Sequence, residues 1–372
     1  MYEERQLYDD LVYVLFYGGV TVLAVVACVY LMFRRGNAFA PEITPPLRLR
    51  RWVAAFFALM ALGHVWWVLL SYFRVVSDPL LALAVGGGLD CLTLVPMMMA
   101  MLLVMLQDRR RPLWPIVVAM VPVAAVLVVC IVIRSYAFEP LLRVYLILLG
   151  IVYMIVMTQA VRRYGRWLRD NYADLEHKEV WQSLVAIFVC LLILCFYIII
   201  GSDKTFAYIV QVNDIVLIGL LLWRVETLQT LEQDDTAAQT APSEAETPIP
   251  SMSLSATTAS NIGQLLEQHC EATQLYLRHD IRVDDLCKAI GTNRNYLSQY
   301  FAQQHTTYNT YINNLRIEHF VRLYREAIAN SRPFTAQQLA QESGFRSYST
   351  FGTAFKQRMG QNVSSWMHDA AK

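Results

Sequence analysis

Seven long apolar segments occupy the first 223 residues, and they constrain the fold more than any other feature of the sequence. A helix needs about 20 apolar residues to cross the hydrocarbon core of a bilayer, and each segment approaches or exceeds that length. The segments cover residues 11–33, 52–73, 80–106, 113–133, 141–160, 181–200 and 207–223. Charged residues make up only 16% of the chain, which excludes a single soluble domain. The sequence therefore predicts an all-α fold that begins with a seven-helix transmembrane domain over residues 1–223.

The distribution of Lys and Arg predicts the orientation of these helices, because basic loops remain in the cytoplasm. One set of alternate loops holds 13 basic residues, whereas the other set, with the N-terminal tail, holds four. Seven crossings then place the N-terminus outside and every residue after Trp223 in the cytoplasm. We expect a multi-pass protein of a bacterial inner membrane, with the lipid bilayer as one partner.

Four ionisable residues interrupt the apolar segments, and such residues are costly in a membrane and are by default candidates for function. They are His64, Asp90, Arg143 and Asp214. With a rise of about 1.5 Å per residue, His64, Asp90 and Asp214 fall roughly 10 to 15 Å below the outer surface, whereas Arg143 lies higher. The three residues at one depth therefore form a candidate cluster.

Two interpretations of this cluster remain open. The ionisable residues either pair with one another and fix helix packing, or they line an outward-facing pocket for a small-molecule or proton signal. Polar and aromatic neighbours could add hydrogen bonds and stacking to such a pocket: Trp66, Trp67, Gln211 and Asn213. Gly86 to Gly88 and Pro96 predict a loosened, bent helix at this level. The inner halves of the helices carry few polar groups, which disfavours a transport path.

Two connections differ from the apolar segments in composition. The loop at residues 162–180 is the most highly charged connection, and its helix-forming residues predict that the flanking helices extend into the cytoplasm as a short stalk. Its surface faces either the lipid headgroups or the soluble domain. Residues 224–260 read as an acidic, flexible linker, because beyond Arg224 they contain six acidic residues and no Lys or Arg.

The last 112 residues form a second domain, residues 261–372, with 12 Lys and Arg against 9 Asp and Glu. Apolar residues recur at spacings of three and four, which predicts helices. Residues 283–301 and 335–356 each have the pattern of a helix-turn-helix. The first is expected to pack inward through Leu286, Ala289, Ile290, Tyr296, Leu297, Tyr300 and Phe301. The second is expected to pack inward through Leu339, Ala340, Phe345, Phe351 and Phe355.

This C-terminal region resembles the AraC/XylS-type DNA-binding domain, over residues 261–367 and no earlier residue. The matching residues are Tyr311, Ile312, Leu315, Arg316, Ile317, Ala340, Ser343, Gly344, Phe345, Phe351, Phe355, Lys356, Gly360 and Trp366. The resemblance implies a transcription regulator that binds double-stranded DNA and acts with RNA polymerase. It also implies two recognition helices in successive major grooves on one face of the duplex. A homodimer would add effective concentration, although two units on one chain can already read a bipartite site.

The resemblance also implies which side chains meet DNA. The base-reading positions fall on Asn295, Ser298, Gln299, Tyr348, Ser349 and Thr353. Arg294, Arg346 and Lys356 are better placed for phosphates, where they add affinity and salt dependence without specificity. Many family members carry Arg where this chain has Gln299 or Thr353, so the base sequence that it reads does not follow from the family.

These features favour a one-component regulator that couples a signal at the seven helices to DNA binding. The alternative is a membrane-anchored latent factor that proteolysis in the linker releases. An enzyme is disfavoured because GxxxxGK, HExxH and GxSxG are all missing from the sequence. No cysteine or histidine spacing suggests a metal site, and we expect no cofactor.

Overall fold

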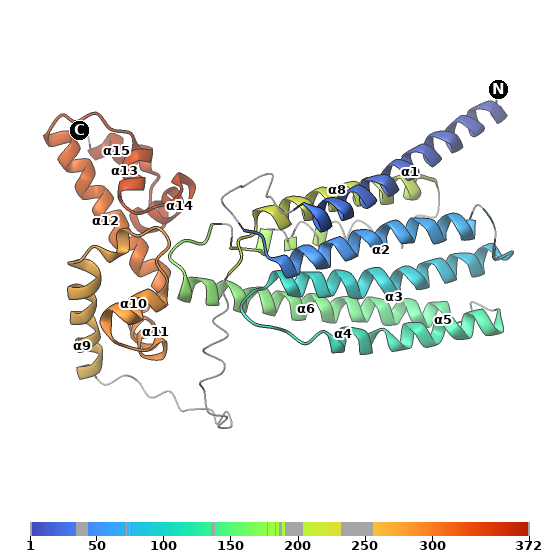
Figure 1. Ribbon diagram of the computed structural model, residues 1–372, viewed down its shortest axis with the longest axis horizontal. Coiled ribbons are helices and arrows are strands. Elements are labelled where there is room, and N and C mark those ends of the chain that lie inside the picture. Colours follow the sequence, from blue (N-terminus) through green and yellow to red (C-terminus); the bar gives the residue numbers. More distant parts are fainter. Residues whose placement is uncertain are drawn as a thin grey trace. The chain divides into compact units, whose positions relative to one another are not determined.

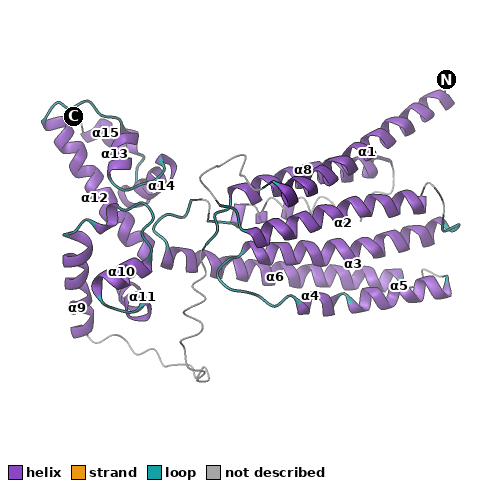
Figure 2. Ribbon diagram, viewed as in Figure 1, coloured by secondary structure: helices purple, strands orange, loops and turns teal. Residues whose placement is uncertain are grey.

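The computed structural model describes residues 2–34, 44–71, 73, 75–134, 138–176, 178–182, 184–185, 188–189, 204–231 and 256–370. Within these residues the regular structure is helical and contains no strand (Figure 2). One isolated antiparallel bridge pairs Tyr172 with Arg282. The predicted all-α fold is confirmed.

The chain forms two compact units, each described separately here. The N-terminal unit contains Met1–Arg162 and Val180–Gln233, and the C-terminal unit contains Arg163–Glu179 and Asp234–Lys372. The segment Arg163–Glu179 therefore packs with the C-terminal residues, although the sequence pattern placed it between two membrane helices.

The N-terminal unit is built from long apolar helices (Figure 1). They are α1 (Tyr2–Phe33), α2 (Leu47–Ser71), α3 (Pro79–Met105), α4 (Trp114–Ala119), α5 (Val121–Ile133), α6 (Glu139–Asn171) and α8 (Lys204–Thr227). Six stretches among the described residues are long and apolar enough to cross a membrane: Leu11–Phe33, Leu47–Leu70, Ala84–Met105, Trp114–Ile133, Pro140–Asn171 and Ala207–Thr227. The predicted span at 181–200 falls mostly outside the described residues. Several long apolar helices indicate a multi-pass membrane protein.

Proline and glycine set local details of these helices. Pro115 and Pro122 lie in the first turns of α4 and α5, where the missing N–H has no helical partner to lose. Pro96 lies inside α3, which nevertheless runs unbroken from Pro79 to Met105. A Cβ atom at Gly86 would approach the Trp67 ring to 2.8 Å. This glycine therefore allows close packing of α3 on α2, which is a different role from the predicted loosening.

The C-terminal unit consists of short helices around one long helix. They are α9 (Ala256–Leu266), η1 (Glu267–Glu271), η2 (Leu275–Leu277), α10 (Val283–Ile290), α11 (Arg294–Gln303), α12 (Tyr308–Ala329), α13 (Ala336–Glu342), α14 (Tyr348–Met359) and α15 (Val363–Ala370). Described helices thus occupy both ends of the predicted linker 224–260, because α8 runs to Thr227 and α9 begins at Ala256. Residues 232–255 lie outside the described part of the chain.

Two hydrophobic cores hold the C-terminal unit, and α12 passes from one to the other. The first core is largely aliphatic and includes Leu266, Leu286 and Ile312. The second is rich in aromatic rings and includes Phe320, Phe345, Phe351 and Phe355. Rings of Phe320 and Phe351 lie 4.5 Å apart between centroids. Each core supports one helix-turn-helix.

The predicted inward faces of the two helix-turn-helix segments are largely confirmed, with two corrections in the first segment. All five residues expected inside the second unit are buried, with exposed fractions of 2% or less. In the first unit Tyr296 is 49% exposed and Ala289 is also exposed. Leu297 and Phe301 define the buried stripe of α11, and Tyr296 lies about 100° away from Leu297 around the helix. Cys287 lies in the first core beside Leu286.

Candidate nucleic-acid interface and intramembrane polar cluster

The first helix-turn-helix consists of α10, a turn at Gly291 and α11. Gly291 has φ of 68°, a left-handed conformation that glycine adopts without strain. Asn293 caps α11 because its side-chain oxygen accepts the N–H of Tyr296 at 2.9 Å. The three base-reading candidates of this unit are all exposed on α11: Asn295, Ser298 and Gln299.

Arg294, a candidate phosphate ligand, is engaged by a carboxylate of its own unit. Its Nε donates to Asp284 Oδ1 at 3.2 Å, and its Nη2 donates to Asp284 Oδ2 at 2.6 Å. This is the bidentate geometry in which a guanidinium would also hold a phosphate. Asp284 therefore offsets the charge that Arg294 would present to DNA, a partner that the sequence pattern did not identify.

The second helix-turn-helix consists of α13, a turn at Gly344 and α14. Gly344 has φ of 89°, and a Cβ there would lie 2.8 Å from the carbonyl oxygen of Leu277. Both the conformation and the space therefore require glycine. Ser347 caps α14, since its hydroxyl accepts the N–H of Thr350 at 3.2 Å. The buried turn at Gly344 thus fixes the orientation of α14 relative to the first core.

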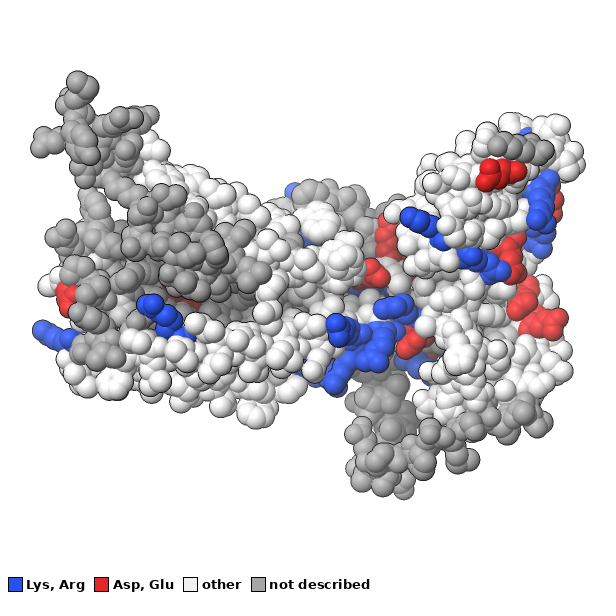
Figure 3. Space-filling model, turned by 180° about the vertical axis from the view of Figure 1, so that it is seen from behind, with Lys and Arg blue, Asp and Glu red and all other residues white. Residues whose placement is uncertain are grey.

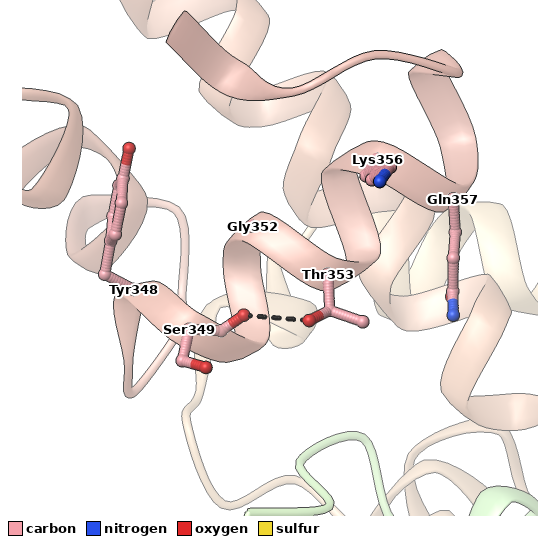
Figure 4. Close-up of a pocket in the computed structure, with 6 residues that line it drawn as sticks. All are labelled: Tyr348, Ser349, Gly352, Thr353, Lys356 and Gln357. Carbon is pink, nitrogen blue, oxygen red and sulfur yellow. Dashed lines mark hydrogen bonds between the residues drawn. The ribbon is translucent and has the colours of Figure 1, made fainter.

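One face of α14 forms a shallow surface depression (Figure 4). Its lining consists of Tyr348, Ser349, Gly352, Thr353, Lys356 and Gln357. The base-reading candidates Tyr348, Ser349 and Thr353 are exposed there, and the Thr353 hydroxyl donates to the carbonyl oxygen of Ser349 at 3.1 Å. Gly352 and Gln357 complete this face, and the family pattern had not singled them out. Lys356 also lies here, whereas Arg346 is exposed just before the helix.

Arg316 joins the second helix-turn-helix to the segment that precedes the first. It is only 1% exposed, and its guanidinium donates to the carbonyl oxygens of Tyr276 at 2.8 Å and Arg278 at 2.6 Å. Its cation lies 5.6 Å from the centroid of the Phe345 ring, within the range of a cation–π interaction. Burial lowers the pKa of Arg316 to about 10. The resemblance named this residue as matching, but its buried bridging role emerges only from the structure.

Charged side chains are unevenly distributed between the units. On the face drawn in Figure 3, the apolar helices carry few Lys, Arg, Asp or Glu residues, whereas both signs of charge occur on the C-terminal unit. Large apolar side chains are correspondingly exposed on the N-terminal unit, among them Val22, Phe33 and Val132. This pattern suits lipid contact for the N-terminal unit and water contact for the C-terminal unit.

In the N-terminal unit, α2 and α8 bring His64 and Asp214 together. His64 Nε2 lies 3.1 Å from Gln211 Oε1 and 3.9 Å from Asp214 Oδ2. His64 Nδ1 lies 2.9 Å from the carbonyl oxygen of Met60. The His64 ring is 4.5 Å from the Tyr17 ring of α1, whose hydroxyl donates to the carbonyl oxygen of His64. Three helices thus meet at one buried imidazole.

Asp90 of α3 accepts hydrogen bonds from the indole groups of two residues of α2. Trp66 Nε1 donates to Asp90 Oδ1 at 3.2 Å, and Trp67 Nε1 donates to Oδ2 at 2.7 Å. Asn213 of α8 is buried, and its Nδ2 has no hydrogen-bond partner in the described part of the chain. Arg143 lies on α6 with an exposed side chain, apart from the helices that carry these contacts.

A further buried ion pair lies at the predicted cytoplasmic ends of α2 and α8. Arg50 Nη1 is 3.7 Å from Glu226 Oε1, and both side chains are almost fully buried. Arg50 Nε also donates to the carbonyl oxygen of Leu31 at 2.7 Å. Arg50 is one of the 13 basic loop residues that predict the orientation of the helices in the membrane. That count does not reveal its ion pair with Glu226. The pair connects the end of α8 to α1 and α2.

Comparison with known families identifies the C-terminal unit. Residues 286–369 match the family model described as "Helix-turn-helix domain". No curated protein and no solved structure matches the chain. The chain thus carries an AraC-type helix-turn-helix DNA-binding domain at its C-terminus, preceded by helices of membrane-spanning length. A domain of this type implies DNA binding and is typical of transcription regulators.

Proposed function

We propose that this protein is a one-component transcription regulator that reads DNA from the membrane and responds to a signal at the intramembrane polar cluster. We define this cluster as Tyr17, His64, Trp66, Trp67, Asp90, Gln211, Asn213 and Asp214. The observation that carries the proposal is the contact of His64 with Gln211 and Asp214. It links α2 to α8 within apolar helices that belong to the same chain as a DNA-binding domain.

The chemistry of the cluster suits a proton or a small polar molecule. Protonation of His64 or of either carboxylate changes the charge balance across α2, α3 and α8. A polar ligand could replace the bond between His64 and Gln211 or use the amide of Asn213. Either event alters the contacts that hold α8 against α2. A signal can shift the protein between two conformations only if it interacts more favourably with one of them.

The proposal includes a route out of the cluster along α8. Asp214 and Glu226 lie on the same helix, about 18 Å apart at a rise of about 1.5 Å per residue. Glu226, near the C-terminal end of α8, pairs with Arg50 of α2. A shift of α8 therefore changes contacts at both ends, and the second set lies next to the linker.

We infer the remaining properties from the sequence. The N-terminus is outside, the C-terminal domain is in the cytoplasm of a bacterium, and the DNA contacts are Asn295, Ser298, Gln299, Tyr348, Ser349 and Thr353 for bases. Arg294, Arg346 and Lys356 contact phosphates, and RNA polymerase and a second copy of the chain are partners of the regulator. The 13 to four distribution of basic residues supports this orientation.

The test begins with chromatin immunoprecipitation of the full-length tagged protein, combined with membrane fractionation of the same culture. Transcription from a bound promoter is then measured in Asp214→Asn and Asp90→Asn variants across external pH. We expect changed transcription at unchanged protein level and unchanged membrane fraction. Asp78→Asn, the same chemical change in the connection between α2 and α3, serves as the control.

Two results would contradict the proposal. Transcription identical to that of the unmodified protein in both variants, at every pH and with every inducer, would remove the sensing role of the cluster. Promoter binding that occurs only with a soluble fragment of about 15 kDa, a size typical of one small domain, would favour proteolytic release from the linker instead.

A further inference from the structure

The loop that follows α6 is buried against the DNA-binding domain. We call residues 172–176 together with Lys178 the docking loop; they belong to the C-terminal unit. Tyr172, Ala173, Asp174 and Lys178 are each 8% exposed or less. A charged loop between membrane helices would ordinarily lie in water. Here Ala173 is fully buried in the first core of the DNA-binding domain, with Leu266, Leu286 and Ile312.

The docking loop is held by α12, the helix that joins the two helix-turn-helix units. Asn309 Nδ2 donates to the carbonyl oxygens of Tyr172 at 3.2 Å and Ala173 at 2.6 Å. Asn313 Nδ2 lies 3.4 Å from the Ala173 oxygen. Tyr172 also forms an antiparallel bridge with Arg282, whose guanidinium lies 5.9 Å from the centroid of the Tyr172 ring. These contacts satisfy the carbonyl groups of a loop that has left water.

The acidic part of the docking loop reaches the second recognition helix. Glu176 Oε2 accepts a hydrogen bond from Thr350 Oγ1, in the first turn of α14, at 3.5 Å. Asp174 shapes the loop, since its Oδ1 accepts the N–H of Glu176 at 3.0 Å. Burial lowers the pKa of Lys178, and the charges of Arg346 and Arg282 lower it further. The loop therefore lies in the electrostatic field of Arg346, the cation that precedes α14.

DNA phosphates favour the same kind of position. The N-terminus of a helix attracts anions, and phosphates bind there in many DNA complexes. Glu176 provides an anion from the chain itself beside this end of α14. A phosphate that approaches Arg346 and α14 meets the carboxylate of Glu176, and like charges repel.

We propose that the docking loop is an intramolecular competitor of DNA, so that docking of the loop and DNA binding by α14 oppose each other. The proposal rests on the proposed function and specifies its regulation. The loop is covalently continuous with α6, which contains a candidate membrane span, Pro140–Asn171. A change in that helix therefore reaches a contact with the recognition helix without passing through residues 224–260.

The test measures DNA affinity of the full-length protein in nanodiscs of a neutral phospholipid. The probe is a fluorescein-labelled duplex of mixed sequence, about 20 base pairs long, which covers two successive major grooves. Glu176→Gln is expected to raise affinity about two- to fivefold, as loss of one carboxylate at a helix N-terminus allows. Asn309→Ala is expected to raise affinity about fivefold, because it removes hydrogen bonds that hold the loop and increases the undocked fraction.

Two control variants match these changes. Glu179→Gln makes the same charge change at an exposed position beyond the docking loop, and Asn314→Ala removes the same side chain farther along α12. Both are expected to leave affinity within about twofold of the unmodified protein. Lower or unchanged affinity in both Glu176→Gln and Asn309→Ala would overturn the proposal, because the loop would then support the DNA-bound form or be indifferent to it.

Hydrogen–deuterium exchange gives a second readout that needs no variant. Peptides covering residues 172–176 are expected to exchange faster when the duplex is added, since DNA displaces the loop. Slower or unchanged exchange of these peptides on addition of the duplex would also overturn the proposal that the docking loop competes with DNA. These measurements do not involve the intramembrane polar cluster, so an unaltered transcriptional response in Asp214→Asn would contradict only the sensing proposal.

Discussion

The two helix-turn-helix units have the same order of elements but present different surfaces to DNA. In the first helix-turn-helix, Asp284 accepts two hydrogen bonds from one edge of the Arg294 guanidinium. In the second, Lys356 is exposed in a depression along α14. The first unit therefore has its nearest cation balanced within the protein. Similar folding of two readers does not give them similar electrostatics, and we expect the second unit to contribute more of the affinity for phosphate.

The units also differ in how their turns are confined. Gly291 and Gly344 both have positive φ, but a Cβ at Gly291 meets no atom within 4 Å, whereas one at Gly344 meets the backbone of Leu277. The turn of the second unit is packed against the segment that leads into the first. That of the first unit faces open space. The second turn thus has the stricter requirement for glycine.

The largest expected effect comes from alanine at these two glycines. Gly344→Ala combines a left-handed alanine with a backbone clash and is expected to lower the free energy of unfolding by about 2–5 kcal/mol. Gly291→Ala carries only the conformational cost, about 1–2 kcal/mol. Protease resistance of the C-terminal domain in the full-length protein measures the difference. Equal losses would show that the packing against Leu277 does not distinguish the two turns.

A smaller effect is expected from Arg294 and Lys356. Lys356→Ala should reduce the slope of log affinity against log salt by about 1, as expected when one phosphate contact is lost. Arg294→Ala should change the slope less, because Asp284 already occupies that guanidinium. Fluorescence anisotropy over a range of salt concentrations measures both slopes. If Arg294→Ala gave the larger change, the first unit would be the main phosphate contact, and our assignment would be reversed.

The smallest expected effect concerns pH at the junction of the two hydrophobic cores. His319 Nδ1 on α12 lies 3.1 Å from the hydroxyl of Tyr276 in the first core, and burial together with the charge of Arg322 lowers the pKa of His319. The native state therefore disfavours the protonated imidazole. This stability is fully present above the unfolded pKa of about 6.5 and is lost as pH falls below it. Hydrogen exchange of the C-terminal domain at about pH 7.5 and about pH 5.5 should show the decline, and His319→Gln should reduce it. An equal decline in His319→Gln would assign the pH dependence to other groups.

Much of this architecture follows directly from the sequence. Apolar length predicts the membrane helices, and the spacing of Leu339, Phe345, Phe351 and Phe355 predicts the second core, because a helix with one apolar stripe must bury it. Position along each helix predicts that His64 and Asp214 lie at one depth, whereas their contact is seen only in the structure. These inferences succeed because they depend on the period or length of a single helix.

The remaining features depend on contacts between distant segments. Neither Asn309 nor Ala173 has a pattern that predicts their contact, since 136 residues separate them. Tyr296 is an aromatic residue suited to a core, but it lies beside the buried stripe of α11 and is half exposed. The sequence predicts that Gly86 loosens α3, whereas in the structure the Trp67 ring packs against it. A single sequence does not encode such pairings in any local spacing.

The buried position of Arg316 has a consequence for the DNA that this domain recognises. Arg316 and the continuous α12 fix one reader relative to the other, so the protein has no adjustable joint between them. B-DNA turns once in about 10 base pairs, and one inserted pair rotates the second half-site by about 36° around the duplex axis. Under the proposed function, the interior of the protein therefore sets the spacing of the operator, and selection on promoters preserves the phase of the two half-sites as strictly as their sequence.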